Sequence, residues 1–397
     1  MANKNSFLEQ RISRREFIKK TAMLVGGLAI GAHTLNELFL NKRPSLFSQA
    51  FRNDVPDELW KWSKEAYHYK KLANSVQCQL CPNECVLGEG DRGFCRVRVY
   101  KDNKLYTLAY GNPCSVHVDP IEKKPLYHYL PTTGAFSIAT AGCNFRCLNC
   151  QNWSISQFRP EDTQNYDLMP ESVVLAAQQN NCQSIAYTYS EPSVFYEYML
   201  DTSILANNVG IKNLWITNGY MNEKPLREFC KYLGAANVDL KGFDDNFYIK
   251  VCSGRRDPVL RTLKILKEEK RWFEVTNLMV PTLSDDLDKV REMSQWLYKN
   301  IGADYPLHFS RFHPQYKLTH LPPTPVEVLE SGRKIAMDEG VKFVYIGNVP
   351  GHEAQNTYCP KCGKIVIERE GYNVDMSNFE NGACKSCGEE INGIWNL

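Results

Sequence analysis

The sequence lacks two features that would point to a nucleic acid or a membrane. Its net charge is only +2, with 47 basic against 45 acidic residues, so no excess of one sign favours a polyanion or an anionic membrane surface. Long hydrophobic runs are also missing, since the apolar stretch at 21–32 is far shorter than the ~20 residues of a membrane-spanning helix. What is present is a chain of 397 residues, 43% hydrophobic, enough for about two or three folding units.

Cysteine, by contrast, is abundant. The chain has 15 cysteines, and most fall in three clusters with the spacing of metal ligands. Short C-x2-C pairs favour metal binding in a reducing compartment over disulfides. The clusters are Cys78, Cys81, Cys85 and Cys95; Cys143, Cys147 and Cys150; and Cys359, Cys362, Cys384 and Cys387. Of the isolated cysteines, Cys252 is either a packed thiol or a hydrogen-atom donor to a substrate radical.

The N-terminal residues 1–50 are predicted to be a twin-arginine-like leader or a tether, separate from the fold. Paired Arg14 and Arg15 precede Phe17 and a weak apolar core, which is the pattern of an export signal. Two locations follow. The protein is either cytoplasmic or tethered at the membrane by this segment, or it is exported in folded form by the twin-arginine route.

The central cysteine cluster has the spacing C-x3-C-x2-C after a short apolar run. Three thiolates on one loop suit a [4Fe–4S] cluster, whose fourth iron then stays open to a small molecule. The alternative is a zinc loop with a distant fourth ligand.

From residue 136 to residue 349 the chain alternates strand-like apolar runs with longer helical patterns, which indicates parallel β/α units. Six strands are predicted at 136–141, 184–189, 213–217, 236–241, 273–280 and 307–312. The predicted class is therefore α/β. The predicted domains are the leader at 1–50, a cysteine-rich segment at 51–135, a β/α unit at 136–350 and a zinc ribbon at 351–397.

Active residues of such folds gather at the carboxyl ends of the strands, which selects the candidate site. The candidates are Thr188, Ser190, Glu191, Thr217, Asn218, Asp239, Lys241, Arg311 and His313. Simpler roles remain open for some of them: Glu191 could stabilise a helix dipole, and Asn218 could be a turn residue. The connection at 119–134, which we call the strap, is expected to cover the mouth of the site, with Lys124 or His128 near substrate.

The two outer clusters are predicted to bind metals. Two C-x2-C-G turns, at Cys359–Cys362 and Cys384–Cys387, are typical of a zinc ribbon, with an auxiliary iron–sulfur cluster as the alternative. The upstream cluster, from Cys78 to Cys95, could hold either zinc in a structural role or an auxiliary cluster that relays electrons.

In combination these motifs resemble one family. GCNFRCLNCQNW, YTYSEPSVFYEY, DLKGF, FHPQYKLTHLPPTP and YIGNVPGHEAQNTYCPKCG are similar to the radical S-adenosylmethionine (SAM) enzyme of the AmmeMemoRadiSam system, a relative of the pyruvate formate-lyase activating enzymes. The resemblance implies a partial (β/α)6 barrel. It also implies reductive cleavage of SAM at the [4Fe–4S] cluster, giving a 5′-deoxyadenosyl radical that abstracts hydrogen from a substrate, an oxidoreductase-like activity.

The resemblance also implies roles and partners. The strand-end candidates would bind SAM, and a low-potential donor of the flavodoxin or ferredoxin type would supply the electron. Memo-like and AMMECR-type proteins would be functional partners. One departure is Asn149, which stands where the family has an aromatic residue packed by the adenine, so Phe145 or Trp153 is expected to supply that surface.

Two alternatives to this function stay open on the sequence. The narrower one is a glycyl-radical-enzyme activase, like the activase of pyruvate formate-lyase. The other is a noncatalytic iron–sulfur module for electron transfer or metal delivery.

Overall fold

The computed structural model describes residues 55–396. The leader or tether predicted for residues 1–50 lies outside this part of the chain. Within it, none of the helices has the length and apolar character needed to cross a membrane.

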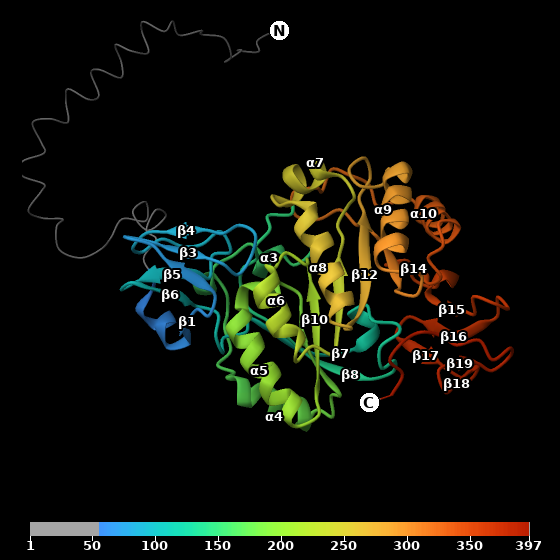
Figure 1. Ribbon diagram of the computed structural model, residues 1–397, viewed down its shortest axis with the longest axis horizontal. Helices are drawn as coiled ribbons and strands as arrows, with labels where there is room; N and C mark the ends of the chain where they lie inside the picture. Colours follow the sequence, from blue (N-terminus) through green and yellow to red (C-terminus); the bar gives the residue numbers. More distant parts are fainter. Residues whose placement is uncertain (1–54, 397) are drawn as a thin grey trace, which may run out of the picture. The chain divides into compact units, whose positions relative to one another are not determined.

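A mostly parallel sheet of eight strands forms the centre of the molecule (Figure 1). The strands are β7 (Ser115–Pro120), β8 (Gly134–Ala139), β9 (Ser184–Tyr187), β10 (Lys212–Thr217), β11 (Ala235–Asp239), β12 (Trp272–Met279), β13 (Leu307–Arg311) and β14 (Val344–Gly347). They follow each other in chain order across the sheet. Strands β8 to β14 are parallel, and β7 pairs antiparallel with β8. The six predicted strands are confirmed within a few residues.

Helices connect the parallel strands and cover one face of the sheet (Figure 1). The longer ones are α4 (Pro170–Gln179), α5 (Tyr196–Asn208), α6 (Glu223–Cys230), α8 (Arg256–Glu268), α9 (Leu287–Asn300) and α10 (Val326–Asp338). Their starts follow local chemistry: Pro170 opens α4, and the Asp286 carboxylate caps α9 by accepting from the amides of Asp288 and Lys289. Short turns are α3 (Trp153–Ser156), α7 (Asp245–Phe247), η2 (Ile121–Lys123), η3 (Pro160–Asp162), η4 (Pro192–Phe195), η6 (Glu353–Gln355) and the π-helical η5 (Tyr248–Cys252).

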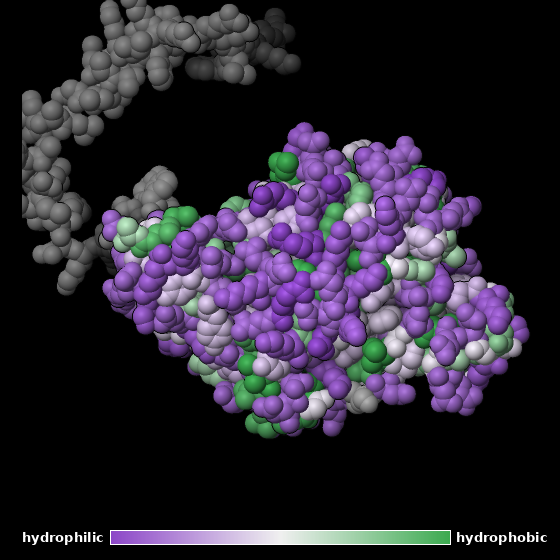
Figure 2. All heavy atoms as spheres, viewed as in Figure 1, coloured by the Kyte–Doolittle hydropathy of each residue, from purple (hydrophilic) through white to green (hydrophobic). Residues whose placement is uncertain are grey.

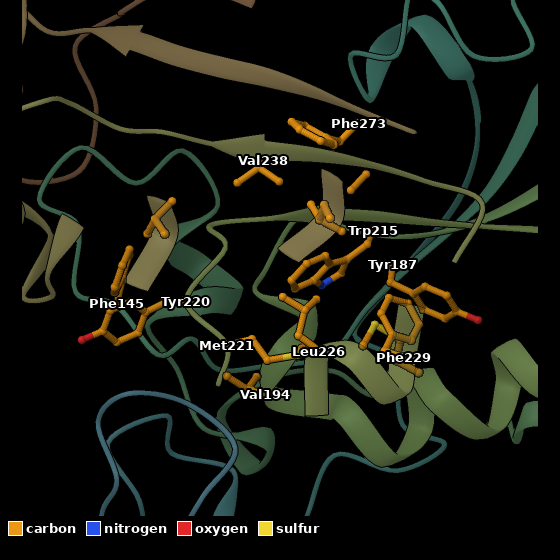
Figure 3. Packing of buried hydrophobic residues seen from close by; sticks show 14 of the residues in the cluster. Phe145, Tyr187, Val194, Trp215, Tyr220, Met221, Leu226, Phe229, Val238 and Phe273 are labelled. Atoms are coloured by element: carbon orange, nitrogen blue, oxygen red, sulfur yellow. The ribbon is translucent and has the colours of Figure 1, made fainter. Parts of the chain in front are cut away.

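The hydrophobic core lies between the sheet and these helices. Figure 3 shows Trp215 of β10 packed beside Phe229 and Leu226 of α6, with Tyr187 of β9 close by. Trp215 and Phe229 meet edge to face, with ring centroids 5.9 Å apart. Outside the core, the face in Figure 2 is mostly hydrophilic, with hydrophobic residues in small groups.

The N-terminal residues form two small antiparallel sheets. One is ordered β1 (Lys64–Glu65), β6 (Lys104–Thr107), β5 (Arg98–Lys101), and the other β2 (Tyr69–Lys71), β3 (Val76–Cys78), β4 (Val86–Leu87). They begin with a short 3-10 helix, η1 (Asp57–Trp62). Just after it, Lys64 and Glu65 pair with β6 as β1.

The C-terminal residues pack beside β14. Their strands are β15 (Thr357–Tyr358), β16 (Ile365–Glu370), β17 (Asn373–Asp375), β18 (Phe379–Glu380) and β19 (Ala383–Cys384). A separate core that includes Phe343, Tyr345 and Ile367 joins them to the central sheet. The last turn also holds the strap through two backbone hydrogen bonds. The Leu130 amide donates to the Ile394 carbonyl at 2.7 Å, and the Ile394 amide donates to the His128 carbonyl at 2.8 Å.

A buried ion pair fastens the N-terminal sheets to the central unit. Arg98 of β5 donates through Nη2 to both carboxylate oxygens of Glu197 on α5, at 2.8 and 2.7 Å. Both side chains are excluded from water, with 1% and 0% exposure. The same carboxylate accepts from the Tyr67 amide at 2.9 Å. Removal of one partner would leave the other charge buried and alone, which is far more costly than loss of a surface pair.

We therefore expect Glu197→Ala to lower the free energy of unfolding by about 3–5 kcal/mol. Asp338→Ala is the matched control, because it breaks the exposed Lys334–Asp338 pair and should cost less than about 1 kcal/mol. Anaerobic denaturant titration of both variants measures the difference. Equal losses would contradict the assigned role of the buried pair.

Candidate active site

One large cavity opens at the carboxyl edge of the parallel sheet, with a volume of ≈ 980 Å³. The cysteine-loop and strand-end candidates selected from the sequence all line it. They are Cys143, Cys147, Cys150, Thr188, Ser190, Glu191, Thr217, Asn218, Asp239, Lys241, Arg311 and His313. Because parallel strands end at the same edge, residues from separate β/α units meet there.

The loop with Cys143, Cys147 and Cys150 follows β8 and faces this cavity. It turns at Gly142, whose φ of +97° favours glycine and whose missing Cβ would lie 2.5 Å from the Cys95 carbonyl oxygen. Two amides fix the loop from behind: Arg146 and Leu148 donate to the carbonyls of Cys252 and Val251, in η5, at 2.8 and 2.9 Å.

The three sulfurs of this loop suit a multi-iron cluster better than one ion. A zinc ion at ~2.3 Å from each sulfur would bring the sulfurs within about 3.8 Å of one another. Within residues 55–396, only the C-terminal cysteines bring three or more such ligand atoms within 4.8 Å. A cluster places each thiolate on a different iron and so keeps the sulfurs further apart.

Glu191 ties together the ends of β9 and β10. It is 2% exposed, and its carboxylate accepts from Thr217 Oγ1 at 2.7 Å, the Asn218 amide at 2.8 Å and the Ser193 amide at 2.9 Å. Burial raises the pKa of Glu191 above its ordinary value. These donors hold the carboxylate in place, so its first effect is to position the two strand ends.

Asn218 carries this order to the cysteine loop. Its Nδ2 donates to Asn144 Oδ1 at 2.8 Å and lies 3.8 Å from Cys143 Sγ. The side chain is 5% exposed. A hydrogen-bonded path therefore runs from Glu191 through Asn218 to the first cysteine of the loop.

Asp239 and Lys241 point to the same side of β11, as their alternation predicts. Lys241 Nζ lies 2.8 Å from Asp239 Oδ2, and both line the cavity. Burial works to lower the pKa of Lys241, but the Asp239 carboxylate outweighs it and the pKa is raised. The site thus presents a fixed cation and a fixed carboxylate beside the loop.

Three buried polar atoms of the cavity wall have no hydrogen-bond partner in the protein. They are Glu122 Oε2, Asn149 Oδ1 and Ser190 Oγ. A buried polar atom without a partner is costly unless a ligand or water satisfies it. The Asn149 oxygen can accept from an amino group, and the Ser190 hydroxyl can donate or accept.

Neither aromatic residue expected near the adenine lines the cavity. Phe145 is fully buried against Tyr220, at 4.7 Å between ring centroids, so it has no face to offer. Trp153 instead stacks on Tyr316, with centroids 5.4 Å apart. The sequence could not reveal this, because spacing alone does not show which way a loop residue points.

The strap contributes a cationic wall, and of its two expected residues only Lys124 lines the cavity. Lys124 Nζ lies 2.6 Å from Asp119 Oδ2, and Asp119 also binds Lys123 and the Tyr189 hydroxyl. Burial lowers the pKa of Lys124 to about 8, although the Asp119 carboxylate acts to raise it. Sequence reasoning missed Asp119 and Tyr189.

His128 lies on the other side of the strap, fully buried in a polar network. Its Nε2 and the Tyr345 hydroxyl are 2.6 Å apart, and its amide donates to Glu274 at 2.7 Å. Glu274 also bonds His308, which lines the cavity, at 2.6 Å. Burial works to raise the pKa of Glu274, but the hydrogen bond from His308 keeps it lowered. Sequence reasoning missed Glu274, although a glutamate within an apolar strand is itself a signal.

Cys359, Cys362, Cys384 and Cys387 form a group that could hold a metal ion. The sulfurs of Cys359 and Cys387 lie 3.5 Å apart, and those of Cys362 and Cys384 lie 3.8 Å apart. These separations match the ~3.8 Å edge of a tetrahedral site with ~2.3 Å bonds.

The chain is similar in sequence to known proteins. The radical SAM superfamily profile matches residues 137–297. An uncharacterized protein of Methanocaldococcus jannaschii is 50% identical over 331 residues, which is 83% of this chain and 98% of that relative. Another protein of that archaeon, named as a candidate glycyl-radical enzyme activating enzyme, is 22% identical over 178 residues, covering 43% of this chain and 66% of that relative.

Among solved structures, a domain of a pyruvate-formate lyase-activating enzyme from Bacteroides vulgatus has a TM-score of 0.37 and 16% identity, covering 41% of this chain and 98% of that chain. The superfamily assignment does not depend on this low score. It depends on the profile match, which includes the cysteine loop and the ends of β9 to β11, and on the long relative. The chain belongs to the radical SAM superfamily.

Proposed function

We propose that this protein is a radical SAM enzyme that cleaves SAM reductively and uses the 5′-deoxyadenosyl radical to abstract hydrogen from a substrate in the cavity. When bound at Cys143, Cys147 and Cys150, a [4Fe–4S] cluster would supply the electron for this cleavage. The observation that carries the proposal is the meeting of these three thiols and the strand-end polar residues around one cavity.

The chain's own residues can hold SAM there. The Asp239–Lys241 pair offers a carboxylate to ribose hydroxyls and a cation to the SAM carboxylate. Asn149 Oδ1, which has no partner in the protein, can accept a hydrogen bond from the adenine amino group. Glu191 would act through Thr217 and Asn218, by keeping the two strand ends in place beside the cysteine loop.

The size of the cavity supports an enzyme over a noncatalytic electron or metal carrier. Its ≈ 980 Å³ is at the top of the range of roughly 300–1,000 Å³ for small-molecule sites, so it can accept SAM together with part of a substrate. A carrier has no need of such space. The AmmeMemoRadiSam assignment, with its Memo-like and AMMECR-type partners and a flavodoxin- or ferredoxin-type donor, is the finer form of this proposal.

A glycyl-radical-enzyme activase is the second candidate, favoured by the 22% identical relative of that name. In that case the substrate would be a glycine of a partner polypeptide whose loop enters the cavity. Electron paramagnetic resonance of the enzyme mixed with a candidate partner distinguishes the two, since only an activase leaves a stable glycyl radical.

Anaerobic reconstitution tests the main proposal. With SAM and dithionite, the wild-type protein should release 5′-deoxyadenosine and methionine, measured by chromatography. Cys147→Ala should reduce both to background, because the loop then has only two thiols. Cys182→Ala is the control, since Cys182 is a buried thiol outside the cavity wall. A wild-type protein that holds iron and SAM yet makes no 5′-deoxyadenosine would contradict the proposal.

The C-terminal group is proposed to be a structural zinc site. Its sulfur separations of 3.5 and 3.8 Å support a single tetrahedral ion. We expect the double variant Cys362→Ser/Cys387→Ser to lose about one zinc per chain in elemental analysis, with unchanged iron content. The control is Cys114→Ser, because Cys114 belongs to none of the three cysteine clusters. Loss of iron rather than zinc would reassign the site to an iron–sulfur cluster.

On the substrate side, Lys124 is the group suited to move a proton near pH 8. Its pKa is about 8 in the fold against 10.5 in an unfolded chain, so the unfolded state binds more protons between these values. Deprotonation of Lys124 in the fold should therefore raise the free energy of unfolding as the pH rises from 8 to 10.5, by up to about 3 kcal/mol. At pH 7 this contribution should be absent. Comparison of the unfolding free energies of wild type and Lys124→Met across this range measures it. A difference that does not change with pH would exclude the lowered pKa.

A further inference from the structure

A second sulfur-lined space lies outside the active-site cavity. Cys78, Cys81, Cys85 and Cys95, here called the cysteine cage, surround an internal cavity of ≈ 20 Å³. Arg98, Asn83 and Asn144 also line it, together with Leu80, Gly93, Ser193 and Val194. We infer that the cysteine cage holds an iron–sulfur cluster rather than zinc, and that it passes the reducing electron to the active-site cysteine loop.

The spacing of the sulfurs separates the two metals. In the same chain, the C-terminal cysteines show what a site for one tetrahedral ion looks like, with sulfurs 3.5 and 3.8 Å apart. Within residues 55–396 that group alone has its ligand atoms within 4.8 Å of one another. No three of the cage sulfurs thus lie within 4.8 Å of one another, which is the wider spacing expected where each thiolate binds a separate iron.

Arg98 gives a second, independent indication. The side chain is 1% exposed, and although Nη2 is paired with Glu197, Nε and Nη1 have no hydrogen-bond partner. Both nitrogens belong to the Arg98 guanidinium, and Arg98 lines the cage. Buried guanidinium donors without a partner are expensive, and an anionic cluster with its bridging sulfides and thiolates would satisfy them. The Phe94 amide already donates to Cys85 Sγ at 3.4 Å, and such bonds to sulfur tune cluster potentials.

The cage is in direct contact with the active-site loop. The Cys95 carbonyl oxygen packs against Gly142, so closely that a Cβ there would lie 2.5 Å away. Asn83 Nδ2 donates to the Asn144 carbonyl at 2.9 Å. Asn144 lines the cage, and its Oδ1 accepts from Asn218, which lies 3.8 Å from Cys143 Sγ. The segment 142–144 therefore contacts the cage and also carries the first cysteine of the active-site loop.

The contact between the cage and the active-site loop suits the cage to relay electrons. This role rests on the proposed function. One electron from a low-potential protein donor of the flavodoxin or ferredoxin type would reduce the group in the cage. That group would be oxidised again as the same electron moves to the group at Cys143, Cys147 and Cys150. No bond forms or breaks in this step.

The decisive experiment uses the full chain with Cys143→Ala, Cys147→Ala and Cys150→Ala together, reconstituted anaerobically with iron and sulfide. The expected result is about four irons per chain, with the Mössbauer signature of a [4Fe–4S] cluster, and about one zinc per chain from the C-terminal site. Two zincs and no iron would overturn the inference. If the triple variant fails to fold, wild type decides instead, with about eight irons expected against about four for zinc in the cage.

The cage variant Cys81→Ser/Cys85→Ser tests the electron step. We expect it to lose about four irons and to slow reduction of the remaining cluster by reduced flavodoxin at least tenfold, followed by freeze-quench electron paramagnetic resonance. The ribbon variant Cys362→Ser/Cys387→Ser is the matched control and should be reduced at the wild-type rate. An unchanged rate in the cage variant would refute the relay. Because these readouts do not need SAM cleavage, failure of the proposed function would be seen separately, as a reducible protein that makes no 5′-deoxyadenosine.

Discussion

The parallel pairing of β8 through β14 is the constraint on which the site depends. Each strand enters the sheet in the same direction, so every carboxyl end reaches the same edge, and the register sets how far each end projects. Thr217 pairs with Val238 and Asp239 with Thr276, which places consecutive strand ends side by side. A shift of one residue in any strand would turn its polar end residue away from the cavity.

The site adds rigidity to this arrangement through hydrogen bonds within the protein. Glu191 accepts from the end of β10, and Asn218 then reaches the loop of Cys143. The Glu191 carboxylate is buried, and burial of this group without these hydrogen-bond donors would cost free energy. Ser190, Asn149 and the Asp239–Lys241 pair are among the cavity groups that remain available to a ligand.

The two outer cysteine-bearing segments are joined to the central unit in different ways. On the N-terminal side, the Arg98–Glu197 pair and the contact of Cys95 with Gly142 bring one set of cysteines against the loop of Cys143. On the C-terminal side, a network runs from His308 through Glu274 to His128. The His128 ring then bonds the Asn392 carbonyl, which connects the cavity wall to the C-terminal segment. The neutral state of His128, whose pKa burial lowers to about 4, suits a structural link. The C-terminal segment thus supports the strap, whereas the N-terminal segment meets the cysteine loop itself.

The sequence by itself determined the order of strands and helices, the C-x3-C-x2-C loop and the polar residues at the strand ends. These signals are local, because periodicity and cysteine spacing are visible within a few residues. Only the tertiary structure decided that Phe145 is buried beneath Tyr220, that Lys124 faces the cavity while His128 faces the ribbon, and that Asp119, Tyr189 and Glu274 join the site. It also decided the close approach of the sulfurs in the C-terminal cysteine group. Side-chain direction and long-range distance depend on how separate segments pack. A local sequence pattern does not show which distant residue a side chain will contact.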